Sequence, residues 1–176
     1  MIKLYRKIDD VYHYHEAWNN NGVVMVHWGT VGDRGQSRKV KVNFWQKPDT
    51  VVEKELSAAR NEGYREINAD DEISILAQYQ IDGFGNENDL NKRHEIENIF
   101  NEALGWTGNG ICDGGATGSG TMEIFSCVVD EEQALKTIRD ALENRGFLDG
   151  AVIAARRQDE DFRVLYPADH ESMFEE

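Results

Sequence analysis

The spacing of apolar residues divides this chain into two parts, and that division limits the folds open to it. Residues 2–42 have the composition and alternation of β-strands interrupted by turns, and helical spacing begins only near residue 50. After the polar sequence NADDE at residues 68–72, the pattern starts again with an alternating strand, ISILAQYQI. The sequence therefore predicts an α+β protein with two domains and an acidic tail. The predicted boundaries are 1–67 for the first domain, 73–166 for the second and 167–176 for the tail.

The first domain is expected to be a small antiparallel sheet with one helix. Four strand segments are separated by turn signals, and Val40 and Val42 in the fourth alternate with basic residues. The valines are expected to face the core, and the lysines between and before them the solvent. Helical spacing follows, with a capping-box pattern at Thr50 and Glu53, and Gly63 is expected to end the helix.

The second domain is expected to have the order βαββαβ, which is the ferredoxin-like arrangement. Asp89 is the expected cap of its first helix and Gly105 its end, and a glycine-rich segment then leads to the strand TMEIFSCVV. Asp130 and Gly146 are the expected cap and end of the second helix, which precedes the strand AVIAARR. The order is complete if WTGNGICD, residues 106–113, is a further strand.

Charge is unequal between the two parts. Residues 1–68 carry 11 Lys and Arg against 9 Asp and Glu, whereas residues 69–176 carry 8 against 24, so nets of +2 and −16 add to the −14 of the chain. Such asymmetry favours two units with different partners. With no long apolar run and no leader pattern, the chain is expected to be cytoplasmic without a membrane partner. Cys112 and Cys127 have no metal-ligand spacing and are expected to be reduced.

One segment resembles a known module. Trp28-Gly29-Thr30-Val31-Gly32, followed by Gly35-Gln36, a basic strand and a terminal Gly63-Tyr64, resembles the WGR domain of DNA-dependent poly(ADP-ribose) polymerases and of bacterial proteins. The resemblance covers roughly residues 1–66 and implies a module in which Trp28 packs on a terminal sugar of DNA. Thr30 stands where the family has arginine, and a hydroxyl cannot reproduce the charged, bidentate contacts of a guanidinium.

The second domain loosely resembles a small ferredoxin-like bacterial domain of unknown function. The segments that carry this resemblance are WTGNGICDGG, TMEIF and LDGAVIAAR. The resemblance implies a fold and no activity.

The candidate ligand-binding residues are those of the basic hairpin at residues 26–42. Alternating cations beside an aromatic ring are typical of surfaces that contact phosphates and stack on a sugar or base. The alternative is that Trp28 belongs to the core and that the lysines only protect an edge strand. The candidates are Trp28, Thr30, Arg34, Gln36, Arg38, Lys39 and Lys41.

Two other patterns in the sequence bear on possible chemistry. The glycine-rich segment 108–120 runs into a strand, whereas phosphate-binding glycine loops open a helix, so a β-loop is the favoured interpretation. His13 and His15 alternate within one strand and could begin a zinc site, but no motif supplies further ligands. No catalytic residue, metal ligand or cofactor is predicted.

Three functional hypotheses follow. The favoured one is a non-catalytic interaction protein whose acidic half binds a protein partner, which the charge suggests to be basic. The second is a nucleic-acid-binding protein that contacts phosphates through residues 26–42, against the long-range repulsion of a −14 chain. The third is an enzyme with a site in the glycine-rich segment 108–120.

Overall fold

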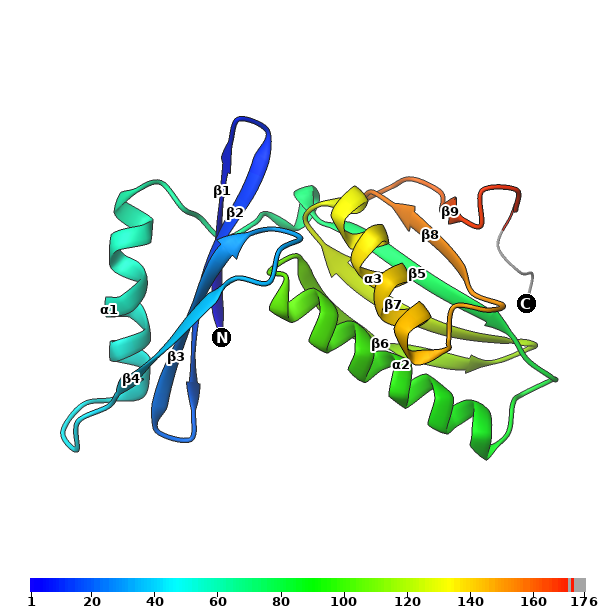
Figure 1. Cartoon of the computed structure of the whole chain (residues 1–176), viewed down its shortest axis with the longest axis horizontal. Helices are drawn as coiled ribbons and strands as arrows, with labels where there is room; N and C mark the ends of the chain where they lie inside the picture. Colours follow the sequence, from blue (N-terminus) through cyan, green and yellow to red (C-terminus); the bar gives the residue numbers. More distant parts are fainter. Residues whose placement is uncertain (171, 173–176) are drawn as a thin grey trace.

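The computed structural model describes residues 1–170 and 172, and it is an α+β structure with two antiparallel sheets (Figure 1). The first sheet has the order β1-β2-β3-β4. Its elements are β1 (Ile2–Ile8), β2 (Val11–Asn20), β3 (Val23–Thr30), β4 (Gln36–Lys41) and the helix α1 (Pro48–Asn61).

One face of the first sheet is covered by α1, and the apolar residues of that face form a hydrophobic core with the helix. Leu4, Ala17, Val26 and Leu56 are fully buried there. Val40 and Val42 pack against this core while Lys39 and Lys41 are exposed, as the alternation predicted.

The first turn of α1 differs from the prediction. The capping box at Thr50 was wrong, because the helix already begins at Pro48, after Lys47, which provides no side-chain cap. Proline fits the first helical position since its missing N–H would have no partner there. Gly63 ends the helix with φ +96°, as expected.

The second sheet has the order β6-β7-β5-β8-β9, and all its neighbours are antiparallel. Helices α2 and α3 cover one face of it (Figure 1). A short 3₁₀ helix, η1 (Ala69–Asp71), lies between the two sheets along the chain. We use first domain for the first sheet with α1 and second domain for the second sheet with α2 and α3. The elements of the second domain are β5 (Ile73–Gln80), α2 (Glu87–Trp106), β6 (Gly110–Gly118), β7 (Thr121–Val128), α3 (Glu131–Arg145), β8 (Val152–Arg156) and β9 (Arg163–Tyr166).

The ends of α3 agree with the sequence prediction, and those of α2 do not. Asp130 caps α3 by accepting a hydrogen bond from the Gln133 N–H, and Gly146 ends that helix with φ +75°. Helix α2 is capped by Asn86, with Asp89 completing the capping box at the third helical position, so Asp89 is not the cap. Gly105 does not end α2 either, since the helix continues to Trp106.

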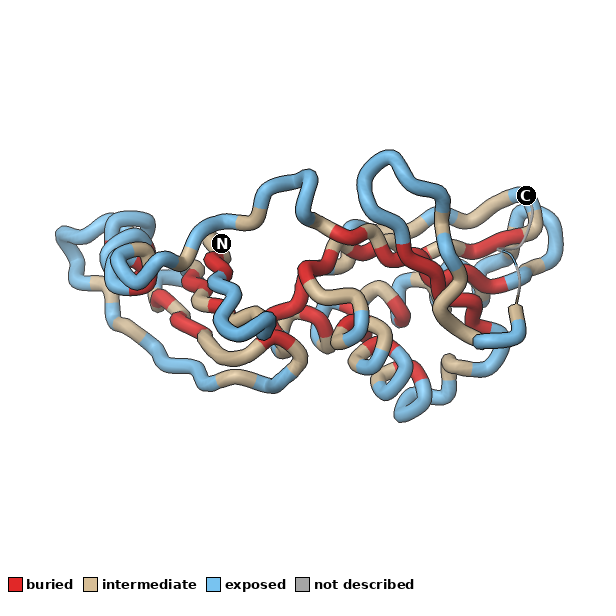
Figure 2. The backbone as a smooth tube through the Cα atoms, turned by 90° about the horizontal axis from the view of Figure 1, so that it is seen from above, coloured by how far each residue is buried: buried red, intermediate tan, exposed pale blue. Residues whose placement is uncertain are grey.

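The two domains meet in a small cluster of aromatic and apolar side chains. Tyr5 and Tyr14 from the first sheet pack with Val31 and Val129. The Tyr5 hydroxyl donates to the Gly108 carbonyl at 3.1 Å, and the Gly32 N–H donates to the Thr107 carbonyl at 3.0 Å. Figure 2 shows buried backbone running through the middle of the molecule where the domains join.

No helix in the described part of the chain combines the length and apolar composition needed to cross a bilayer. Of the predicted acidic tail, Ala168 and Asp169 are exposed while Pro167 and His170 are half-buried. Residues 171 and 173–176 lie outside the described part.

Candidate functional site

Trp28 lies on the α1 face of the first sheet, where other side chains cover part of its ring. Its indole stacks on the His15 ring with 6.0 Å between centroids and 22° between planes, and Tyr64 meets His15 edge-on. It also packs against the buried core of the first domain. Burial, with a smaller effect of the nearby Arg38 charge, lowers the pKa of His15. Part of the Trp28 ring is therefore covered by packing contacts within the chain.

Thr30 and Arg34 lie further along the same hairpin and point to different neighbours. The Thr30 hydroxyl is 3.5 Å from His13 Nδ1, at the limit of a hydrogen bond. The Arg34 guanidinium lies over the Trp106 ring, 5.2 Å from its centroid. Arg34 is thus directed toward the second domain and away from the basic strand.

The remaining candidates lie on β4, which is the edge strand of the first sheet. Gln36 is exposed opposite Trp28, and Arg38 pairs with Glu55 of α1. Lys39 and Lys41 alternate with Arg38 and so project from the other face of the sheet. No carboxylate among the described residues pairs with either lysine.

The seven candidates are therefore divided among three places rather than gathered at one. Trp28, Gln36 and Arg38 belong to the α1 face, and Thr30 lies at the end of β3 on that same face. Lys39 and Lys41 occupy the opposite face, and Arg34 contacts the second domain. Their role in binding a ligand stays a prediction.

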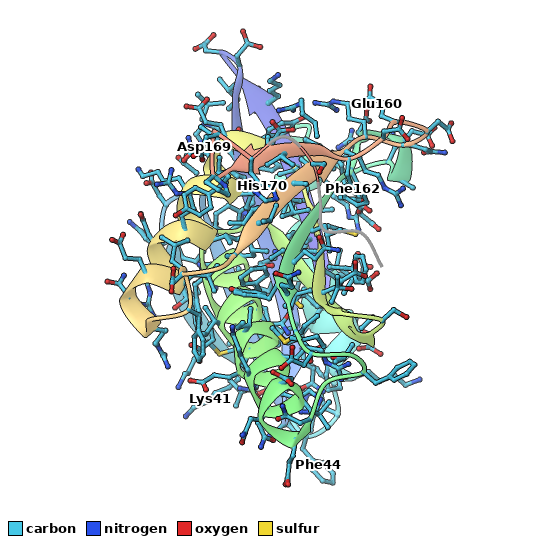
Figure 3. All side chains as sticks on the ribbon, turned by 90° about the vertical axis from the view of Figure 1, so that its right-hand side faces the viewer. Lys41, Phe44, Glu160, Phe162, Asp169 and His170 are labelled. Carbon is cyan, nitrogen blue, oxygen red and sulfur yellow. The ribbon has the colours of Figure 1, made fainter. Side chains whose placement is uncertain are left out.

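A pair of exposed aromatic residues that is not among the seven predicted candidates follows β4. Phe44 is 101% and Trp45 84% exposed, in the loop between β4 and α1. This loop forms the end of the first domain furthest from the second sheet (Figure 1). Figure 3 places Lys41 and Phe44 at one end of the view, with Glu160 and Asp169 at the other. In the sequence, this pair can be recognised as two adjacent aromatic residues within the polar segment NFWQK.

A second feature that the sequence did not reveal is a buried chain of polar groups across the first sheet. Lys3 Nζ lies 3.0 Å from Glu16 Oε2, and Glu16 Oε1 lies 2.7 Å from His27 Nδ1. His27 Nε2 is 2.9 Å from the Tyr14 hydroxyl, which also accepts from the Gly35 N–H at 3.1 Å. Burial raises the pKa of Tyr14 to about 12.

This buried chain explains one glycine of the hairpin. A Cβ at Gly35 would lie 2.1 Å from the Tyr14 hydroxyl oxygen and 2.2 Å from the Trp28 carbonyl oxygen. Only glycine permits that approach, so the turn between β3 and β4 is fixed to the buried groups.

The glycine-rich segment forms β6 and its turn into β7. An added Cβ at Gly110 would lie 2.0 Å from the Cys127 carbonyl oxygen, and one at Gly115 2.4 Å from that of Glu123. These glycines permit a close cross-strand approach, and a bulge between Cys112 and Gly114 shifts the register. A strand, not a helix N-terminus, follows the segment.

Neither cysteine has the environment of a reactive thiol. Cys112 and Cys127 are free and half-buried, and burial raises the pKa of both thiols, opposite to what activates a thiol. Within the described residues, no group of three or more His, Cys, Asp and Glu side chains is arranged to hold a metal ion.

Two cavities open between the domains on either side of Lys3. The larger, about 480 Å³, is bordered by the carboxylates of Glu66, Glu72 and Asp113. The smaller, about 260 Å³, lies between the first sheet and the end of α2, and Trp18 and Trp106 form part of its wall.

The chain matches no protein-family model, no curated protein and no solved structure at a significant level.

Proposed function

We propose that this chain is a non-catalytic interaction protein that binds a protein partner. The binding element is what we term the β4 surface, which consists of β4 and the loop 42–47 that follows it. The observation that carries the proposal is the exposure of Phe44 and Trp45, at 101% and 84%, next to a free edge strand. Neighbouring apolar side chains that are exposed together can mark an interaction site, and tryptophan is prominent among the residues that dominate binding energy.

The edge of β4 supports the same function. Five of its six residues are exposed, and α1 packs mainly against β2 and β3. The opposite edge strand, β1, is paired at Tyr5 with Arg65, so β4 is the more open side of the sheet. An extended peptide can add to such an edge through main-chain hydrogen bonds while its side chains enter neighbouring sites.

The positive charge of the β4 surface indicates the chemistry of the partner segment that would bind it. Lys39, Lys41 and Lys47 are exposed, and within the described residues no carboxylate pairs with them. A segment with acidic side chains would complement these cations and place an apolar residue against Phe44 or Trp45. The expectation of a basic partner for the acidic half stays a prediction, and that half offers a separate surface for it.

Nucleic-acid binding is the second candidate, favoured by the same lysines beside exposed aromatic rings. The four-stranded sheet with one helix supports a WGR-like first domain. The position of Trp28, stacked on His15, leaves less of its ring for a sugar, and the chain's charge of −14 opposes a polyanion at long range. These two observations favour protein binding over nucleic-acid binding.

For the second domain, we propose a ferredoxin-like fold. Its elements β5, α2, β6, β7, α3 and β8 follow one another in the order βαββαβ. The order β6-β7-β5-β8 within its antiparallel sheet supports that fold, with β9 as an added edge strand.

The experiment selects peptides from a displayed random library on the full chain and then measures binding of the selected peptides to variants. We expect acidic peptides with one or two aromatic or aliphatic residues. The double variant Phe44→Ser with Trp45→Ser should bind them at least about tenfold more weakly, because it removes the exposed anchors. Phe84→Ser is the matched control, since Phe84 is 83% exposed but belongs to the second domain.

Two results would contradict this proposal. One is selected peptides that bind the Phe44/Trp45 double variant as tightly as the wild type. The other is binding of a 12-residue oligothymidylate in preference to every peptide, with an affinity that falls steeply with salt, which would favour the nucleic-acid alternative.

A further inference from the structure

The smaller interdomain cavity, which we term the Trp106 cavity, has the construction of a ligand site. It lies on the face of the first sheet opposite α1 and measures about 260 Å³. Its walls combine the indoles of two tryptophans with a helix end that carries no side chain at Gly105. Its lining includes Lys3, Glu16, Trp18, His27, Gly105 and Trp106.

The ionisable groups at this cavity pair with one another, although Lys3 Nζ and Glu16 Oε2 meet as an ion pair without hydrogen-bond geometry. Glu16 accepts from His27 Nδ1 at 2.7 Å and pairs with Lys3 Nζ at 3.0 Å, and both Glu16 and His27 are buried. His27 Nε2 is engaged by the Tyr14 hydroxyl. Because the Lys3 and Glu16 charges cancel, the cavity presents mainly uncharged carbon surface to an occupant.

The aromatic wall is held in place but not fully covered. The Trp106 ring meets the His27 ring edge-on, with 5.2 Å between centroids and 73° between planes. Arg34 lies over the same indole, and Trp106 remains 38% exposed. Aromatic rings favour offset-stacked or edge-to-face neighbours, so a wall with two indoles favours a planar aromatic occupant over a branched aliphatic one.

We propose that the Trp106 cavity receives one aromatic side chain of the protein partner, an inference that rests on the proposed function. The cavity is continuous with the β4 surface, because Trp18, Met25 and Lys39 are direct cross-strand neighbours on β2, β3 and β4. A partner seated on Lys39 can therefore reach the cavity across Met25. A volume of about 260 Å³ accommodates one aromatic side chain and not a drug-sized ligand.

The test uses p-cresol, the side-chain analogue of tyrosine, and the full chain labelled with ¹⁵N. The four tryptophans give four indole N–H signals, which single Trp→Phe variants assign. We expect p-cresol to move the signals of Trp18 and Trp106 saturably, with half-saturation on the order of millimolar for so small a ligand. The signals of Trp28 and Trp45 should not show a saturable shift.

A cavity-filling variant provides the decisive comparison. Gly105 lines the cavity and a Cβ there would meet nothing within 4 Å, so Gly105→Leu is the variant chosen to fill it. We expect this variant to weaken p-cresol binding at least tenfold. Asn98→Leu is the matched control, since Asn98 is exposed on α2 and does not line the cavity, and it should bind p-cresol like the wild type.

The outcomes separate this inference from the proposed function. Shifts that include Trp45 equally, an absence of shifts, or unchanged binding by Gly105→Leu would overturn the assignment of the cavity, whatever the peptide experiment finds. Micromolar binding of free p-cresol would overturn it as well, because a small aromatic molecule would then be the occupant. Selective, millimolar and Gly105-dependent binding supports it even if Phe44 and Trp45 prove dispensable.

Discussion

The contact between the two domains can be tested at Gly108, where the structure leaves no room for a side chain. A Cβ at this position would lie 2.1–2.4 Å from three atoms of the Tyr14 ring. That ring is 1% exposed and is held through its hydroxyl by His27 and the Gly35 N–H, so it cannot move aside freely. Gly108 also has φ +66°, which disfavours any residue with a side chain.

Two effects of Gly108→Ala are expected to lower the free energy of unfolding. The left-handed backbone costs alanine about 1–2 kcal/mol, and forced overpacking costs about 1–3 kcal/mol. The free energy of unfolding should therefore fall by about 2–5 kcal/mol. For a chain of this size, that corresponds to a loss of about 4–20 °C in melting temperature.

Gly146→Ala separates the two effects. Gly146 has φ +75°, but a Cβ there would meet nothing within 4 Å. It should lose only the backbone contribution of about 1–2 kcal/mol. Urea unfolding followed by circular dichroism measures both variants. Equal losses for Gly108→Ala and Gly146→Ala would refute the reasoning, because Tyr14 would then not be packed on Gly108 in solution.

Three further predictions concern the first domain. Tyr14→Phe should lower the free energy of unfolding by about 1–3 kcal/mol at pH 7 in urea titrations, because His27 and the Gly35 N–H lose their partner. The free energy of unfolding of the wild type should also fall between about pH 10 and 12, because the pKa of Tyr14 is near 10 in the unfolded state and about 12 in the folded state. Tyr14→Phe should lose less stability over the same pH range. Because the pKa of His15 is lowered in the folded state, its contribution to stability is present above about pH 6.5 and is lost as the pH falls below that value. His15→Gln should therefore reduce the fall in melting temperature between neutral and acid pH. An unchanged fall would contradict the role of His15. Trp28→Ala should cost about 2–4 kcal/mol by the same titration, because the indole packs on His15 and the core; an unchanged stability would make the ring free for a ligand.

The sequence predicted the elements where side chains reveal the period of the backbone. Val40 and Val42 indicated the buried face of β4, and Asp130 with Gly146 indicated both ends of α3. The prediction was less accurate where the local signal was shared by several residues: Asn86 and Asp89 both suit a helix cap, and the capping box uses both. In β6 the glycines have no side chains to show alternation, so the strand could be expected only from the order of its neighbours.

The candidate site could be predicted only in part, because the sequence of one strand does not show which residues of the next strand lie opposite it. Glu16 and His27 are direct neighbours on β2 and β3, yet eleven positions separate them along the chain. Arg34 and Trp106 come from different domains, so no local pattern could connect them. Phe44 and Trp45 were visible as residues, but their exposure follows from the direction in which the loop leaves β4.

The pairing of Tyr5 with Arg65 has a consequence for how many molecules can assemble through the first sheet. Because β1 is covered at its centre, this sheet can be extended on the β4 side alone. Each chain then offers one such edge, so a partner segment that pairs with β4 should bind with a stoichiometry of one to one. Two copies could also pair β4 with β4 about a two-fold axis, and in that dimer neither β4 edge would remain exposed. Association through this sheet therefore ends at a closed pair and does not propagate into a fibre.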